Sequence, residues 1–238
     1  MRLRTGTSGF SYAPWKGPFY PEDLPNARML AFYASKLPSV EINNTFYRMP
    51  TPELLGSWAG EVPGDFSFAL KASQQITHRK RLRECAEPVE YFFRVAGELG
   101  ERLGPVLFQL PPNLKRDVPR LAEFLALLPA GRRCALEFRH ESWFCDETYD
   151  ALRARGAALC VAEAEDLATP LVATADWGYL RLRRQDYDAA LLRAWSEKIS
   201  TQPWQETWVF FKHEDSGVGP RLALELTSLF SASTSSGG

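Results

Sequence analysis

The sequence lacks the features that mark zinc centres, dinucleotide-binding folds and membrane spans. Its four cysteines show no CxxC or other metal-binding spacing, and three histidines are too few for a histidine-rich zinc cluster. No GxGxxG fingerprint follows the first predicted strand. No apolar run reaches the roughly 20 residues that cross a bilayer. These absences argue against a zinc site, a Rossmann-type domain and a membrane segment.

An excess of either charge is also missing. There are 28 Lys and Arg residues against 29 Asp and Glu, so the net charge is −1 and bulk basicity does not indicate nucleic acid. The 238 residues are 45% hydrophobic and 24% charged, which is typical of an ordinary globular protein. The first residues lead directly into a turn-rich segment without a signal-peptide pattern, so we expect a cytoplasmic protein.

Strand-like and helix-like segments alternate along the chain. Runs rich in β-branched and aromatic residues predict strands at 3–8, around Glu41, and at 65–71, 105–110, 133–138, 158–162, 178–182 and 207–211. Apolar periodicity predicts helices at 27–37, 52–59, 88–102, 118–128, 146–155, 186–199 and 219–230. Three residues are expected to cap helices, namely Asn26, Thr51 and Asp117. Residues 72–86 form a basic loop or short helix, and 163–174 leave room for a short helix only.

This alternation predicts the fold class. Strict β–α alternation indicates a parallel sheet, and eight such units in 238 residues predict a closed (β/α)8 TIM barrel. We expect a single domain over residues 1–230. A doubly wound open sheet is the alternative, and the missing GxGxxG counts against it. Residues 231–238 are small and polar, so we expect a disordered tail there.

The strand around Glu41 carries a row of polar side chains. Glu41, Asn43 and Thr45 occupy alternate positions, so they share one face of the strand. Val40 and Ile42 point the other way, towards the predicted helices. Burying the polar face without partners would cost roughly 1–3 kcal/mol for each neutral group and more for the carboxylate. That face is therefore either solvated or part of a polar site.

Several later strands end in polar side chains of the same phase. In TIM barrels the active site lies at the C-terminal ends of the strands, and the barrel interior is usually filled by Val, Ile and Leu. This many polar groups at one rim therefore indicates a binding or catalytic site: Lys71, Gln109, Glu137, Arg139, Tyr179, Arg181, Lys212 and His213. His140 follows the polar end of the fifth strand, and Asp176 just precedes the seventh.

The same residues also admit structural interpretations. Two neighbouring pairs could be simple ion pairs, namely Glu41 with Lys71 and Glu137 with Arg139, and such pairs say little about stability. Gln109 could satisfy backbone groups, His78 could be a solvated loop residue, and Asp176 could serve a turn. The basic run 79–83 is either solvated or holds an anionic ligand. Four aromatic residues would either wall a pocket or cover the barrel mouth: Tyr12, Trp15, Tyr47 and Trp143.

A metal site deserves separate consideration. Hard cations take oxygen ligands, so three acids are conceivable ligands for Mg²⁺ or Mn²⁺: Glu41, Glu137 and Asp176. Lys71 and Arg139 argue against this because they would already neutralise the carboxylates. We therefore predict no metal and no other cofactor.

Six segments resemble one known family. They are Gly6–Tyr12 with Trp15, Phe19–Pro21, Glu41–Tyr47, Phe68–Lys71 with Thr77 and His78, Phe108–Pro112, and Glu137–Trp143. Over about residues 4–230 the chain is similar to domain of unknown function 72, also called YecE-like. The resemblance implies a TIM barrel and no established activity. The last strand departs from the family, whose members typically have an aromatic pair followed by asparagines, where this chain has Phe210-Phe211-Lys212-His213-Glu214-Asp215.

The polar rim predicts an enzyme that hydrolyses a phosphate-bearing or otherwise anionic small substrate, because arginine and lysine bind such groups. Glu137 or Glu41 would be the base, Lys71 and Arg139 would stabilise negative charge, and His140 would be an acid. Further residues would bind the substrate: Tyr12, Trp15, Asn43, Tyr47, His78, Gln109, Trp143, Asp176, Tyr179 and Arg181. Aromatic stacking beside a basic rim makes nucleic acid a sub-case. One alternative is aldolase- or isomerase-like carbon chemistry with Lys71 as a Schiff-base amine or proton shuttle. Another is a binding module without turnover for an anionic metabolite or nucleic acid.

Overall fold

The computed structural model describes residues 1–163, 168–184, 186–212 and 215–235. His213 and the last three residues of the expected tail lie outside this part of the chain. Eight parallel strands close into a barrel in sequence order. They are β1 (Arg2–Ser8), β2 (Ser39–Ile42), β3 (Ser67–Lys71), β4 (Leu103–Gln109), β5 (Cys134–Glu137), β6 (Ala158–Glu163), β7 (Trp177–Leu182) and β8 (Glu206–Phe211). The predicted TIM barrel is confirmed.

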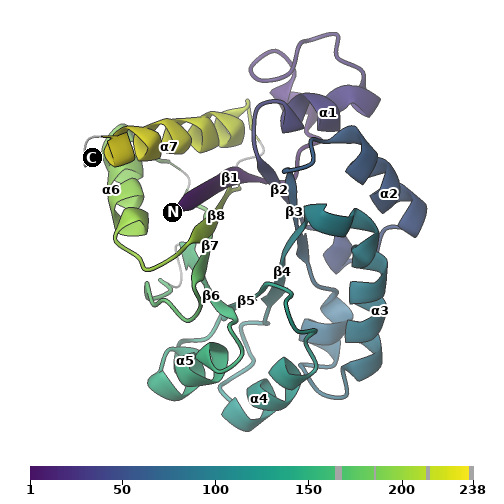
Figure 1. Ribbon diagram of the computed structural model, residues 1–238, viewed down its shortest axis with the longest axis vertical. Coiled ribbons are helices and arrows are strands. Elements are labelled where there is room, and N and C mark those ends of the chain that lie inside the picture. Colours follow the sequence, from purple (N-terminus) through teal and green to yellow (C-terminus); the bar gives the residue numbers. More distant parts are fainter. Residues whose placement is uncertain (164–167, 185, 213–214, 236–238) are drawn as a thin grey trace.

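Helices surround the barrel on its outer side (Figure 1). The α-helices are α1 (Met29–Ala34), α2 (Pro52–Glu61), α3 (Ala86–Ala96), α4 (Val118–Ala126), α5 (Asp146–Arg153), α6 (Ala189–Ser200) and α7 (Val218–Ser235). Short 3-10 helices are η1 (Ala13–Trp15), η2 (Asn26–Arg28), η3 (Asn44–Phe46), η5 (Gly97–Arg102) and η6 (Glu141–Trp143), and η4 (Gln75–Arg79) is a π-helix. Between β6 and β7, residues 168–176 contain no helix.

Local sequence signals explain two of the helix starts that the sequence predicts. Thr51 accepts a hydrogen bond from the backbone N–H of Leu54 at 3.3 Å, and Asp117 accepts one from Arg120 at 3.1 Å, so both predicted caps are confirmed. The prediction for Asn26 is wrong, because this residue lies inside η2 and caps no helix. Helix α7 continues to Ser235, so the first five residues of the expected tail are helical.

Strand β2 ends earlier than the alternating pattern predicts. It stops at Ile42, and Thr45 lies in η3, where its hydroxyl donates to the carbonyl of Lys71 at 2.6 Å. This hydrogen bond links the segment after β2 to the end of β3. Val40 and Ile42 belong to the core between strands and helices, as the alternation predicts.

Inside the barrel, small and aromatic side chains form a second apolar cluster. It comprises Ala69, Leu107, Ala135, Ala158, Cys160, Trp177, Tyr179, Trp208 and Phe210. This packed layer closes the middle of the barrel, so the polar groups of the next layer stand above it at the C-terminal ends of the strands. The search for membrane spans, limited to the described residues, finds no helix with the length and apolarity to cross a bilayer.

Candidate functional site

Arg181 on β7 lies at the centre of the polar layer. Its Nη2 donates to Oε1 of Glu41 at 2.7 Å, and its Nη1 donates to Oε2 of Glu137 at 2.6 Å. Glu41 comes from β2 and Glu137 from β5, so one guanidinium joins strands from three parts of the barrel. All three side chains are at most 2% exposed. They form a buried carboxylate–guanidinium–carboxylate triad.

Glu41 is surrounded by hydrogen-bond donors. Besides Arg181, it accepts bonds from Ser8 Oγ at 2.7 Å, Asn43 Nδ2 at 3.0 Å and Tyr179 OH at 2.7 Å. Burial by itself would raise the pKa of this carboxyl, but the charge of Arg181 and these bonds outweigh it and lower the pKa below its ordinary value. Glu41 is therefore ionised and held rigidly.

Glu137 lies close to several donors and cations at the rim. Its Oε1 accepts from Gln109 Nε2 at 3.0 Å and from Arg139 Nη1 at 3.2 Å, and Arg183 Nη1 lies 3.8 Å away. The ion pair with Arg139 is thus present. Arg183 was not among the residues predicted from the sequence, although it continues the phase of Tyr179 and Arg181 by two positions. Its side chain is 17% exposed, and that of Arg139 is 22% exposed.

Lys71 ends β3 at the same rim but follows a different pattern. Its Nζ lies 4.1 Å from the ring centroid of Phe46, and it makes no ion pair with Glu41 or with any other described carboxylate. Burial and the neighbouring charge of Arg181, with Lys212 adding to them, lower the pKa of Lys71 to about 8, although the two carboxylates of the triad oppose the shift. Lys71 is therefore a partly buried amine with a pKa well below that of an ordinary lysine.

Two histidines stand near the rim. His78 lies in η4 and packs edge-on against Phe46 with ring centroids 4.9 Å apart, and burial together with Lys71 lowers its pKa. Single π-turns of this kind are frequent at functional sites. His140 accepts a bond from the backbone N–H of Ser142 on its Nδ1 at 3.1 Å. Because Nδ1 accepts this bond, the ring N–H is on Nε2.

The aromatic candidates separate into two groups. Trp15 and Trp143 are fully buried, and Trp143 stacks on Phe138 at 4.7 Å and donates its Nε1–H to the carbonyl of Leu114 at 2.7 Å. As core residues, these two tryptophans cannot contact a ligand, which corrects their assignment to substrate binding. Tyr12 is partly buried and donates to the carbonyl of Ser8 at 2.6 Å, whereas Tyr47 beside Phe46 is 73% exposed.

Asp176 does not belong to the rim. It directly precedes β7, so it lies at the opposite, N-terminal end of the barrel, where its carbonyl accepts from the backbone N–H of Gln205 at 2.7 Å. The three acids considered as metal ligands are therefore not brought together, and Arg181 occupies the position between Glu41 and Glu137. Among the described residues, no three His, Cys, Asp or Glu side chains form a cluster that could hold a metal ion.

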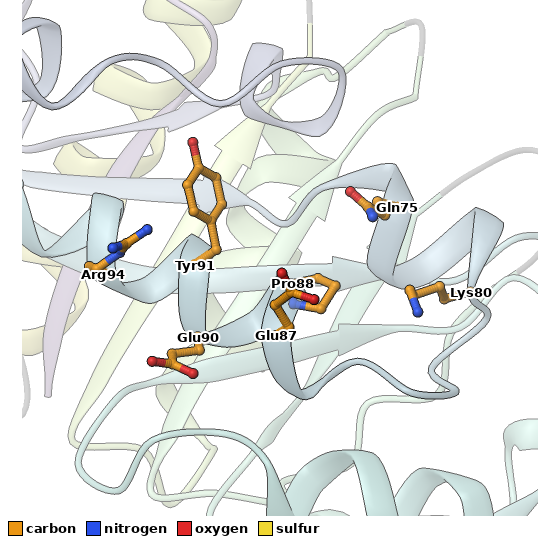
Figure 2. A pocket seen from close by; sticks show the side chains of 7 residues that line it. All are labelled: Gln75, Lys80, Glu87, Pro88, Glu90, Tyr91 and Arg94. Carbon is orange, nitrogen blue, oxygen red and sulfur yellow. The ribbon is translucent and has the colours of Figure 1, made fainter.

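A separate cavity lies outside the barrel. It has a volume of about 320 Å³ and is lined by side chains of α3, with Gln75 and Lys80 from the region of η4 (Figure 2). Its charged lining is balanced, with Glu87 and Glu90 against Lys80 and Arg94. The described lining of this cavity therefore carries no excess of either charge.

At the rim, positive charge is in excess. Within the described chain, the inward-facing strand ends and their continuations place five cationic side chains beside two carboxylates: Lys71, Arg139, Arg181, Arg183 and Lys212 against Glu41 and Glu137. Both carboxylates are already occupied by internal donors. Among the described inward-facing residues of this end of the barrel, cations therefore outnumber carboxylates.

The chain is similar to several known proteins. It is 34% identical to protein YecE of Escherichia coli strain K12 over 113 residues, which are 47% of this chain and 42% of that protein, so the chain spans less than half the length of this relative. It is 25% identical to protein YunF of Bacillus subtilis strain 168 over 213 residues, covering 82% of this chain and 73% of that protein.

Solved structures agree with the fold. A DUF72 family protein from Thermotoga maritima is 28% identical, with a TM-score of 0.85 over 97% of this chain and 100% of that one. A D-psicose 3-epimerase is 10% identical, with a TM-score of 0.53 over 98% of both chains, a likeness of fold alone. The family model described as protein of unknown function DUF72 matches residues 4–236. This chain, with its barrel and its polar rim, belongs to the DUF72 family.

Proposed function

We propose that this protein is an enzyme that binds a phosphate-bearing or otherwise anionic substrate at the C-terminal rim of the barrel and hydrolyses it. The observation that carries the proposal is the excess of positive charge there. Glu41 and Glu137 are committed to internal partners, and Arg181 is buried between them. Four cations remain that are partly or fully exposed to a ligand: Lys71, Arg139, Arg183 and Lys212.

Arg139 and Arg183 are the proposed anchors of the anion. Nη1 of Arg139 and Nη1 of Arg183 lie 3.2 Å and 3.8 Å from the same oxygen, Oε1 of Glu137. A guanidinium has five N–H donors, so most donors of both side chains remain for a ligand. The Nε of Arg183 is buried and has no hydrogen-bond partner among the described residues. Two guanidinium groups held side by side match the bidentate geometry that phosphate oxygens accept.

The proton-transfer roles follow from the surroundings of each group. The low pKa of Glu41 makes it a poor proton acceptor, and both oxygens of Glu137 are bound by Arg181, Gln109 and Arg139. Lys71 is therefore the base, instead of either carboxylate. The neutral amine of Lys71 takes a proton from the attacking water. The water oxygen bonds to phosphorus as the P–O ester bond breaks, and the cations stabilise the charge that develops on the phosphoryl oxygens. Nε2–H of His140 donates a hydrogen bond to the leaving oxygen, which takes its proton from solvent.

The test combines binding with turnover. Calorimetry with inorganic phosphate is expected to show binding that weakens about tenfold in Arg139→Gln and in Arg183→Gln, because each loses a charge-assisted hydrogen bond. Release of nitrophenolate from bis-p-nitrophenyl phosphate and p-nitrophenyl phosphate measures hydrolysis. Asp176→Asn, which changes an acid at the other end of the barrel, is the matched control and should behave like the wild type.

Two results would count against the proposal. If phosphate does not bind, or binds equally well to both arginine variants, the anion site is not at the rim. If phosphate binds but neither ester is cleaved across pH 6–9, the hydrolytic step fails while the anion site stands.

A further inference from the structure

We infer that Lys71 is a nucleophile towards carbonyl carbon and forms an imine with a phosphate-bearing aldehyde or ketone held at the rim. This activity goes beyond hydrolysis. It rests on the proposed function only for the anion site that holds the phosphate group. The substrate class is therefore a small carbonyl compound that carries a phosphate.

The surroundings of Lys71 fix the position of its amine, and no described carboxylate forms an ion pair with it. The backbone of Lys71 is fixed in β3, and its carbonyl accepts a hydrogen bond from Thr45 at 2.6 Å. The ammonium group lies over the face of Phe46 at 4.1 Å, and no described carboxylate lies within ion-pair distance of it. The neighbouring cations Arg139 and Arg181, by contrast, both bind carboxylates directly.

The local charges also favour the neutral, reactive form of the amine. With a pKa of about 8, about half of the Lys71 amines are neutral at pH 8, whereas an ordinary lysine with a pKa near 10.4 is about 0.4% neutral. That is about a hundredfold more free amine. Lower basicity reduces the reactivity of each amine by roughly the square root of this factor, as it does for thiolates, so we expect a net advantage of about tenfold.

The reaction balances without any further reagent. The lone pair of Lys71 Nζ attacks the carbonyl carbon, the C–N bond forms as the C=O π pair moves to oxygen, and a proton passes from Nζ to that oxygen to give a carbinolamine. The hydroxyl, hydrogen-bonded by Nε2–H of His140, takes a proton from solvent and leaves as water while nitrogen forms the C=N bond and returns its second proton to solvent. The phosphate group, bound by Arg139 and Arg183, keeps the carbonyl near the amine and raises its effective concentration.

Pyridoxal 5′-phosphate is the probe, because it joins an aldehyde to a phosphate group. The full-length protein is incubated with it at pH 8, reduced with cyanoborohydride, digested and mapped by mass spectrometry. We expect modification of Lys71 about tenfold faster than of Lys80, which lies outside the rim and pairs with Glu84 at 4.0 Å. Pyridoxal without phosphate should lose this preference, and inorganic phosphate should compete with the probe.

Two variants complete the test. Lys71→Arg keeps the charge and should lose the rapid modification, whereas Lys80→Arg should retain it. Labelling spread evenly over surface lysines of the wild type would overturn the inference without relying on any variant. Phosphate binding at the rim without labelling of Lys71 would leave the proposed anion site standing and remove the imine, whereas absence of both would remove the two proposals together.

Discussion

Replacing Arg181 by methionine is the sharpest perturbation of this barrel. Methionine keeps much of the length of the side chain but removes the one cation of the described residues that touches both Glu41 and Glu137, at 2.7 Å and 2.6 Å. Both carboxylates are 0% exposed, so neither can turn to water without a rearrangement of the barrel mouth. The variant therefore buries two carboxylates that face each other across an apolar side chain.

The magnitude follows from the partners that remain. Removing one partner of a buried ion pair typically costs 3–5 kcal/mol. Glu41 keeps neutral donors such as Ser8 and Tyr179, and Glu137 keeps Gln109 and Arg139, so the loss is moderated at each end. We expect Arg181→Met to lower the free energy of unfolding by about 4 kcal/mol at pH 8.

The loss should depend on pH in a definite direction. Without Arg181, burial raises the pKa of Glu41 above its unfolded value near 4.3, so the folded variant takes up a proton more readily than the unfolded chain. Stability of the variant should then rise as the pH falls from 8 to 5. Wild-type Glu41, whose pKa is lowered, contributes stability above pH about 4.3 and loses it only below that value.

Urea denaturation followed by tryptophan fluorescence at pH 5 and pH 8 measures both effects. The double variant Arg181→Met with Glu41→Gln is the companion, and it should recover part of the loss at pH 8 because one buried charge is gone. A loss below about 1 kcal/mol, or the same loss at both pH values, would refute the argument that Arg181 compensates two buried charges.

Two further predictions concern stability. Lys71→Met should raise the free energy of unfolding by about 1 kcal/mol at pH 7, because burial and Arg181 disfavour the ammonium. The pKa of Lys71 is about 8 in the folded protein and near 10.4 in the unfolded chain, so wild-type stability should rise as the pH increases between these values. Urea titrations that show the same rise in Lys71→Met would show that Lys71 is not its source. Trp143→Ala should cost about 3–5 kcal/mol, and a loss under about 1 kcal/mol would show that its ring is not a core residue.

Strand phase was enough to predict much of the rim. Glu41, Glu137 and Arg181 each occupy the inward position at the C-terminal end of a strand, and in a closed parallel barrel such positions meet at one end. Strand alternation therefore brings together residues that are far apart in the sequence. The same phase extends to Arg183, which lies one step beyond the predicted strand.

The pairing of charges could not be predicted in the same way. Sequence adjacency of β2 and β3 favours an ion pair between Glu41 and Lys71, but a long arginine side chain from β7 reaches across the narrow barrel and binds Glu41 instead. Which cation reaches a carboxylate depends on side-chain length and barrel diameter, and neither is a local property of the sequence. Lys71 is consequently left beside Phe46.

Loop residues were the other source of error. Trp15 and Trp143 lie in aromatic segments that follow strands, and such a composition is typical both of a pocket wall and of a packed loop. Whether these tryptophans are buried depends on tertiary contacts, such as the stacking of Trp143 on Phe138. Asp176 was assigned to the site although it precedes its strand. Its position at the start of β7 is sufficient to place it at the other end of the barrel.

The central claim is that the C-terminal rim binds an anion through its surplus cations. The most direct measurement is a crystal structure of the protein grown with tungstate, an anomalously scattering analogue of phosphate. We expect tungstate within hydrogen-bond distance of Arg139 and Arg183, close to Lys71, with the triad of Glu41, Arg181 and Glu137 unchanged beneath it. A rim without tungstate at saturating concentration, or an anion that instead displaces Glu137 from Arg181, would contradict anion binding by the surplus cations.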